Sequence, residues 1–288
     1  MAPSRELMDR IEFIGAQGVG KSTLFLHVRR QRSPRDRWVT PGEARIRVAQ
    51  RLCGRDHPSP WRRGLRLALK WNLLPFKREA VAGWLLTPYA PAVFDGMPRW
   101  ARVLMDLQLE RLAGRDRTAS AGELRCESEV PWIATADGLR KAQAISFSLE
   151  ALMEMATLEY FHQDLPVVYA DGGLMVNQLG VSAAVLEELT QGDCRHPLLP
   201  RGVVHCRLTV DELFHRRKKR IERGQGQFTE RALDDDALRA SCRSMSRQME
   251  LKADVLQQVG VPVLSLAMAD APDGNARQAL AFIREHSA

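Results

Sequence analysis

The chain has 288 residues, 45% of them hydrophobic, which suffices for one large core or for a core with a smaller subdomain. Its 42 Lys and Arg against 35 Asp and Glu give a net charge of +7, which suits an anionic partner without requiring one. Five scattered cysteines argue against a disulfide framework and favour a reducing cytoplasm. No stretch approaches the roughly 18 apolar residues of a membrane span, and the N-terminus lacks an apolar signal region, so we expect neither feature.

The first predicted element is an apolar strand at residues 11–14, followed by a glycine-rich loop and a helix at residues 22–30. The loop, Gly-Ala-Gln-Gly-Val-Gly-Lys-Ser, fits the phosphate-binding pattern G-x-x-x-x-G-K-[ST]. Its glycines let backbone N–H groups surround phosphates, and the helix directs its positive dipole end at them. Lys21 would reach the β- and γ-phosphate oxygens, and Ser22 would bind Mg²⁺. The predicted nucleoside triphosphate site comprises Gly15, Gln17, Gly18, Val19, Gly20, Lys21, Ser22 and Thr23.

A weak strand signal at residues 37–40 precedes Pro41 and Gly42, and an unusual segment then begins. Residues 54–131 are rich in Trp and Pro, so we predict a helical insertion that divides a core made of residues 1–53 and 132–288. Within the insertion, residues 62–77 interleave bases with Leu, Trp and Phe. We interpret the insertion as a cap over an acceptor pocket. The alternative is an interaction surface, with residues 62–77 lying on an anionic membrane or binding a partner.

A helix at residues 138–162 and a strand at residues 166–170 lead to Asp171, Gly172 and Gly173. A carboxylate at the end of a parallel strand lies beside the phosphate loop. Asp171 would accept the proton of an attacking hydroxyl or hold Mg²⁺ through water. The alternative is a turn residue before two glycines, in which case Glu43 is the next candidate for the catalytic carboxylate.

A strand at residues 202–206 is followed by a basic helix at residues 210–223 and by Gly224 and Gly226. We predict a mobile lid in which Arg217, Arg220 and Arg223 neutralise the transferring phosphoryl group. The alternative is a solvated basic helix, since its six bases cannot share one face. Side chains of zinc-binding types also occur here: Cys194, His196, His205 and Cys206. Their irregular spacing favours buried packing over a zinc site.

The last predicted elements are a helix at residues 235–259, a strand at 261–266, a loop at 269–275 and a helix at 276–286. Continuous apolar strands that alternate with helices indicate a parallel sheet covered on both faces. We therefore predict an α/β, three-layer P-loop NTPase fold with about five strands and the helical insertion.

Together the phosphate loop, the strand ending in Asp171 and the basic helix make the chain resemble P-loop kinases of the nucleoside and nucleotide kinase type, and thymidylate kinases most of all. The resemblance covers residues 11–30, 40–43 and 138–286. Its specific motif is the phosphate loop, whereas the other matches are of order and spacing. Rival classes fit less well, because no Asn-Lys-x-Asp motif of guanine-binding GTPases and no Leu-Ser-Gly-Gly-Gln motif of transporter ATPases occurs.

The sequence departs from that family where its acceptor binds. The arginine that follows the strand-end Asp and holds the acceptor's phosphate is Gly172 here, and the arginine ahead of Pro41 is absent. These departures favour a hydroxyl acceptor other than a nucleoside monophosphate, such as a sugar or glycan intermediate. The resemblance thus implies a kinase that uses ATP and Mg²⁺, contacts the base through residues 269–275 and has no nucleic-acid partner. The alternative is a P-loop ATPase or nucleotide-binding protein that couples ATP to a partner or membrane surface.

Overall fold

A computed structural model describes residues 10–52, 165–170, 183–190, 199–225 and 233–287. It also describes some isolated residues between these ranges: 82, 154, 155, 157, 158, 173, 175 and 231. The predicted insertion therefore lies outside the described residues, apart from Ala82, and its boundaries stay a prediction. Among the residues described, no helix combines the length and apolar character needed to cross a bilayer.

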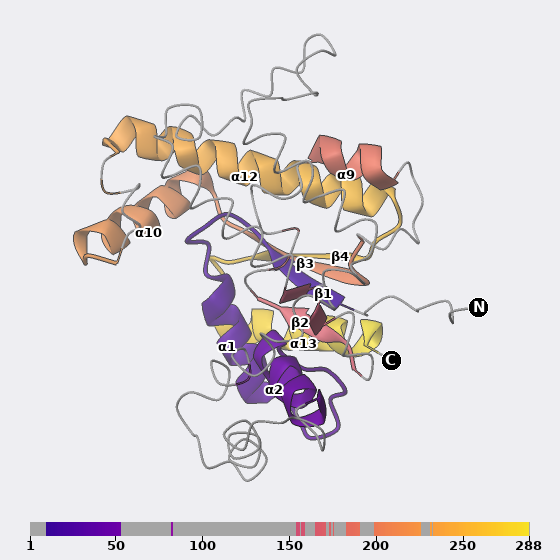
Figure 1. The fold of residues 1–288 in the computed structure, drawn as a ribbon. Helices are drawn as coiled ribbons and strands as arrows, with labels where there is room; N and C mark the ends of the chain where they lie inside the picture. The colour runs from indigo at the N-terminus through magenta and orange to yellow at the C-terminus, as the bar shows by residue number, and fades with distance from the viewer. Residues whose placement is uncertain are drawn as a thin grey trace.

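The described chain is an α/β structure built on a parallel sheet (Figure 1). Its strands are β1 (Arg10–Ile14), β2 (Val167–Tyr169), β3 (Gly202–Arg207) and β4 (Val263–Ala267), in the order β2-β1-β3-β4. The sequence predicts a further strand at residues 37–40, where the structure has a single parallel bridge from Val39 to Val167. Because all pairs are parallel, the carboxyl ends of the strands meet at one edge.

Helices lie on both sides of the sheet (Figure 1). On one side are α1 (Lys21–Gln31), α2 (Pro41–Leu52) and α13 (Pro272–His286). On the other side are α9 (Ala183–Thr190) and α12 (Asp235–Gln258), with α10 (Val210–Glu222) extending beyond the sheet edge. This arrangement agrees with the prediction of a parallel sheet between helices.

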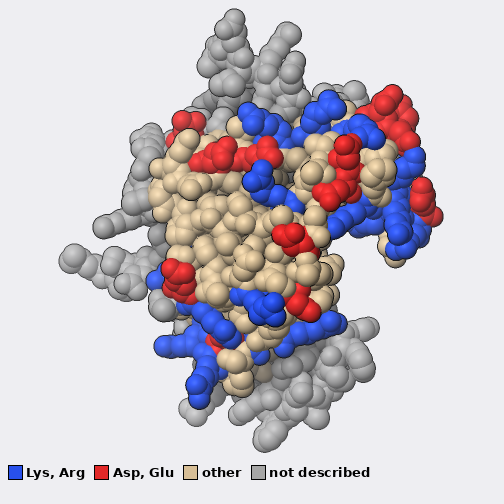
Figure 2. Space-filling model, turned by 180° about the vertical axis from the view of Figure 1, so that it is seen from behind, with Lys and Arg blue, Asp and Glu red and all other residues tan. Residues whose placement is uncertain are grey.

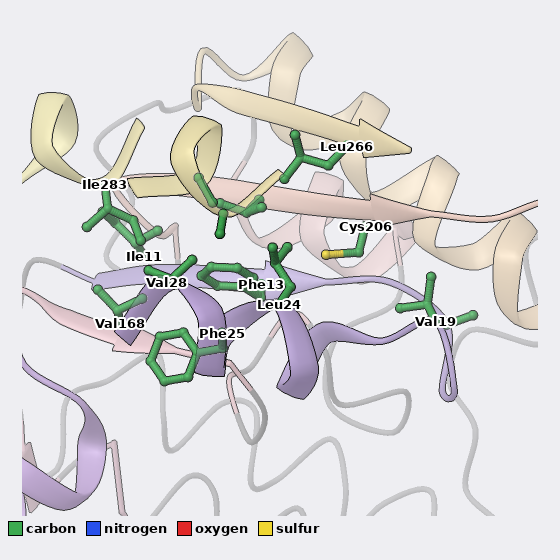
Figure 3. Close-up of a cluster of buried hydrophobic side chains, with 14 of the residues drawn as sticks. Ile11, Phe13, Val19, Leu24, Phe25, Val28, Val168, Cys206, Leu266 and Ile283 are labelled. Atoms are coloured by element: carbon green, nitrogen blue, oxygen red, sulfur yellow. The ribbon is translucent and has the colours of Figure 1, made fainter. Parts of the chain in front are cut away.

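The main core lies between the sheet and the helices α1 and α13 (Figure 3), and it continues to side chains of α10 and α12. Side chains alternate along a strand, so Ile11 and Phe13 of β1 point to the same face, and both are fully buried. Leu24, Phe25 and Val28 of α1 pack on them, and the Phe13 and Phe25 rings meet edge to face at 5.5 Å. The alternate strand positions, including Glu12 and His205, point to the opposite face.

Local sequence sets where the helices begin. Thr209 and Glu212 form a reciprocal capping box at the start of α10, and Asp234 caps α12 by accepting from the Ala237 N–H. At α2, the Thr40 hydroxyl accepts from the Glu43 N–H while the Glu43 carboxylate accepts from the Thr40 N–H. Pro41 and Gly42 therefore belong to the first turn of α2, a position that suits proline because its missing N–H would have no helical partner.

The burial of His205 predicts a pH dependence of stability. Burial, with the charge of Arg207, lowers the pKa of His205 to about 4 from 6.5, so the folded state keeps this ring neutral. Between pH 6.5 and 4, His205 is protonated in the unfolded chain but stays neutral in the folded chain. The free energy of unfolding therefore falls as the pH falls. The full loss is about 3 kcal/mol, since one pKa unit corresponds to ~1.4 kcal/mol.

Urea denaturation at pH 7 and pH 4.5 should show this loss in the wild type and a clearly smaller one in His205→Gln. The comparison isolates His205 from the other titrating groups. Identical pH dependence in the two proteins would contradict the assignment.

Candidate functional site

The glycine-rich loop of residues 15–20 connects β1 to α1 at the carboxyl edge of the sheet. Gly15, Gly18 and Gly20 adopt φ angles of 144°, 89° and 107°, which side-chain-bearing residues rarely adopt. A Cβ on Gly15 would lie 2.5 Å from the Cys206 carbonyl oxygen of β3, and one on Gly18 would lie 3.0 Å from Cγ of Arg217. The loop thus needs glycine for both its backbone conformation and its close neighbours.

The side chains of the loop divide between the core and the surface. Val19 is buried and anchors the loop in the main core (Figure 3). Lys21 is also buried, and its Nζ donates to the carbonyl oxygens of Gly15 at 2.8 Å and Ala16 at 3.4 Å. Ser22 and Thr23, in the first turn of α1, are exposed, and Gln17 is partly exposed. The N-cap residue of α1 is Gly20, with no side-chain cap.

The loop after β4 lies beside the glycine-rich loop. The Met268 N–H donates to the Arg207 carbonyl at the end of β3, at 2.8 Å, and Cε of Met268 lies 3.4 Å from the position of a Cβ on Gly20. Asn275, buried at the start of α13, donates from Nδ2 to the Ala267 carbonyl at 2.8 Å. The segment from which we predict a base contact, residues 269–275, is therefore a neighbour of the predicted phosphate site.

Arg216 connects these two loops. One guanidinium nitrogen donates to the Val19 carbonyl at 3.0 Å and the other to the Met268 carbonyl at 2.9 Å. The sequence does not single it out, because it is one of five Lys and Arg residues in α10. The signal that locates it is the capping box: once Thr209 begins the helix and Leu213 faces the core, Arg216 lies at the border of the buried face.

Arg217, a predicted lid arginine, is turned into the protein and is 3% exposed. Its guanidinium donates to Ser241 Oγ and Cys242 Sγ of α12, both at 3.3 Å, while its aliphatic stem covers Gly18. Arg220 is partly exposed and Arg223 is exposed. Spacings of four and three residues place Arg216, Arg220 and Arg223 along one stripe of the helix, leading away from the loop.

Charges of both signs cover the corner made by α10 and the start of α12 (Figure 2). Lys218 forms an ion pair with Asp235, and Arg239 forms one with Asp211. The Arg239 guanidinium also lies over the Phe214 ring, 4.3 Å from its centroid. Two bases of the predicted lid region, Arg217 and Lys218, are therefore engaged in holding α10 to α12.

Other predicted site residues lie outside the described residues: Asp171, residues 62–77 and residues 226–229. Glu43, the alternative carboxylate, is occupied by the cap of α2 and by Arg32, whose Nη1 lies 2.9 Å from Oε2. Burial alone would raise the pKa of Glu43, but the Thr40 N–H and Arg32 outweigh it and lower that pKa. A proton acceptor with a lowered pKa is a weak base, so Glu43 is poorly suited to that role.

The zinc alternative gains no support from the described part of the chain, where no group of three or more His, Cys, Asp or Glu side chains is placed to hold a metal ion. Cys206 belongs to the main core, while His205 points to the opposite face of β3. Cys194 and His196 lie outside the described residues.

Comparison with family models and with curated proteins found no match to this chain.

The tight fit of the loop predicts a difference between two glycine substitutions. Gly15→Ala and Gly224→Ala both place alanine at positive φ, but only Gly15 has a neighbour within van der Waals contact, because nothing lies within 4 Å of a Cβ on Gly224. Gly224→Ala should cost about 1 kcal/mol of unfolding free energy from backbone strain. Gly15→Ala should cost more, because the Cys206 carbonyl must also move. Urea denaturation measures the unfolding free energy of both variants. An equal loss would show that the backbone around Gly15 accommodates the methyl group without cost.

Proposed function

We propose that this chain is a P-loop protein of the three-layer type that binds ATP with Mg²⁺ and transfers the γ-phosphoryl group to a hydroxyl acceptor. The observation that carries the proposal is the glycine-rich loop between β1 and α1. Positive φ angles at three glycines, close packing against β3 and α10, and an uncapped helix N-terminus occur together there. Backbone N–H groups at such a terminus favour an anion.

The residues at the loop fit a nucleoside triphosphate with its magnesium ion. Ser22 offers an exposed hydroxyl in the first turn of α1, which is the ligand that Mg²⁺ takes in loops of this pattern. Bound Mg²⁺ would neutralise charge on the β- and γ-phosphates. Lys21 already lies at the loop, and its ammonium would exchange carbonyl oxygens for phosphate oxygens.

Arg216 supplies a second cation at the same place, and Arg220 and Arg223 continue its stripe along α10. We assign the stabilisation of the transferring phosphoryl group to Lys21 with these arginines, as phosphoryl transfer depends chiefly on positioning and charge neutralisation. Arg217 supports the loop from below through its stem, so its contribution as a direct phosphate ligand would require it to leave Ser241 and Cys242. Asp171 remains the proposed base or second Mg²⁺ partner.

The acceptor is proposed as a hydroxyl compound other than a nucleoside monophosphate, because Gly172 replaces the arginine that such an acceptor needs. Purified protein with Mg·ATP should be screened for ADP release with sugars, glycan intermediates and nucleosides. Release that depends on one acceptor supports the kinase. Release that is unaffected by any acceptor supports the alternative of an ATPase that acts on a partner or membrane surface.

Replacing Lys21 by Ala should weaken ATP binding about 10- to 100-fold, because a charge-assisted contact is typically worth ~1.5–3 kcal/mol. Lys219→Ala is the matched control, since it removes the same charge from an exposed position on α10. Titration calorimetry with Mg·ATP should show unchanged affinity for the control. Affinity retained within about twofold in Lys21→Ala would remove the loop from nucleotide binding.

Asp171→Asn should leave ATP affinity unchanged and slow transfer by about 10²- to 10⁴-fold, the usual contribution of a general base. The amide keeps the size of the carboxylate but does not take up a proton. Asp236→Asn, an exposed position in the first turn of α12, controls for loss of a negative charge. The test is kcat for acceptor-dependent ADP release, and an unchanged kcat would move the base elsewhere.

A further inference from the structure

Three charged side chains are buried together on the face of the sheet that α12 covers. Arg10 and Glu12 of β1 are 2% and 0% exposed, and Lys252 of α12 is 1% exposed. Buried charges are costly, and well-packed apolar residues often replace them without loss of stability. Their presence therefore calls for a role beyond packing.

The contacts of these side chains converge on one residue after β2. Glu12 accepts from Arg10 Nε through Oε1 and from the Met175 N–H through Oε2, both at 2.8 Å. Lys252 Nζ donates to the Met175 carbonyl at 2.9 Å. The N–H and the C=O of Met175 are thus each held by a buried charged side chain, one from the sheet and one from α12. We call Glu12 and Lys252 the Met175 anchor.

Gly173 fits against the same carboxylate. A Cβ at this position would lie 2.3 Å from Oε2 and 2.8 Å from Cδ of Glu12, far inside contact distance. Glu12 is itself fixed by Arg10 and by its place in β1, between β2 and β3. The carboxylate therefore fixes the course of the chain at Gly173 as well as at Met175.

Described residues on both sides of the proposed base in the sequence lie at Glu12. Upstream, Tyr169 pairs with Glu12 in the sheet; downstream, Gly173 packs on the carboxylate of the same Glu12. Asp171 lies in the short connection between these two fixed points. We propose that Glu12 and Lys252 are positioning residues for Asp171, an inference that rests on the proposed phosphotransferase activity. A displacement of about 1 Å at a reacting group costs up to ~10²-fold in rate.

The first test separates positioning from nucleotide binding. Lys252→Met removes the donor to Met175 with little change in size, and Glu12→Gln keeps an oxygen for the Met175 N–H but loses the charge. We expect kcat to fall about 10- to 100-fold in Lys252→Met and less in Glu12→Gln, with Mg·ATP affinity within about twofold of wild type. Glu250→Gln, a half-exposed carboxylate on α12, should leave both unchanged. A kcat within twofold of wild type in Lys252→Met would overturn the proposal.

The second test uses the contact at Gly173. Gly173→Ala should impair turnover, because its methyl group overlaps Glu12. Glu12→Asp withdraws the carboxylate by one methylene, so adding Gly173→Ala to Glu12→Asp should lower kcat much less than Gly173→Ala does in the wild type. An equal loss of kcat in both backgrounds would show that the overlap is not the cause.

Hydrogen exchange at the Met175 amide tests the hydrogen bond to Glu12 without an enzyme assay. Exchange should accelerate at least tenfold in Glu12→Ala and change little in Glu250→Gln. Unchanged exchange in Glu12→Ala would refute the anchor itself. If exchange accelerates in Glu12→Ala while the wild-type protein shows no acceptor-dependent ADP release, the proposed function is refuted and the anchor stands as a structural feature.

Discussion

The pairing of β1 with a parallel strand on each side is the constraint on which the site depends. Parallel pairing with both β2 and β3 brings the loop after β1 to the same edge as the loops after its neighbours. Because side chains alternate along the strand, the two faces of β1 make different contacts. Ile11 and Phe13 form part of the main core, while on the opposite side Glu12 accepts from Arg10 and from the Met175 N–H.

Close packing extends this constraint from the loop to the helices that carry the bases. A Cβ on Gly18 would press on the stem of Arg217, 3.0 Å from its Cγ, and the buried guanidinium of Arg217 in turn requires acceptors on α12. The position of α10 is thus coupled to the loop by sterics and to α12 by hydrogen bonds. Ion pairs at the exposed corner add to this attachment (Figure 2).

The sequence was a good guide to elements with strong local signals. Residues 11–14, 210–223 and 235–259 are predicted as strand, helix and helix, and the structure has β1, α10 and α12 there within one residue at each end. The local sequence pattern does not predict the position of a side chain that depends on a contact with a distant part of the chain. Arg216 and Arg217 are adjacent in a run of bases, yet Arg216 bridges two loops and Arg217 is buried against α12. Glu12 is a charged residue in a mostly apolar strand, and its partner, the Met175 amide, lies 163 positions away in the sequence.

The cations at the loop are held in place before any nucleotide arrives. Lys21 donates to the Gly15 and Ala16 carbonyls, and Arg216 donates to those of Val19 and Met268. Phosphate oxygens carry negative charge and accept hydrogen bonds more strongly than neutral carbonyls. Lys21 and Arg216 would therefore donate to a bound triphosphate in place of these carbonyls. The ordering of these side chains is therefore largely complete in the free protein. The proposed nucleotide binding would therefore exchange hydrogen bonds at the loop without rearranging it.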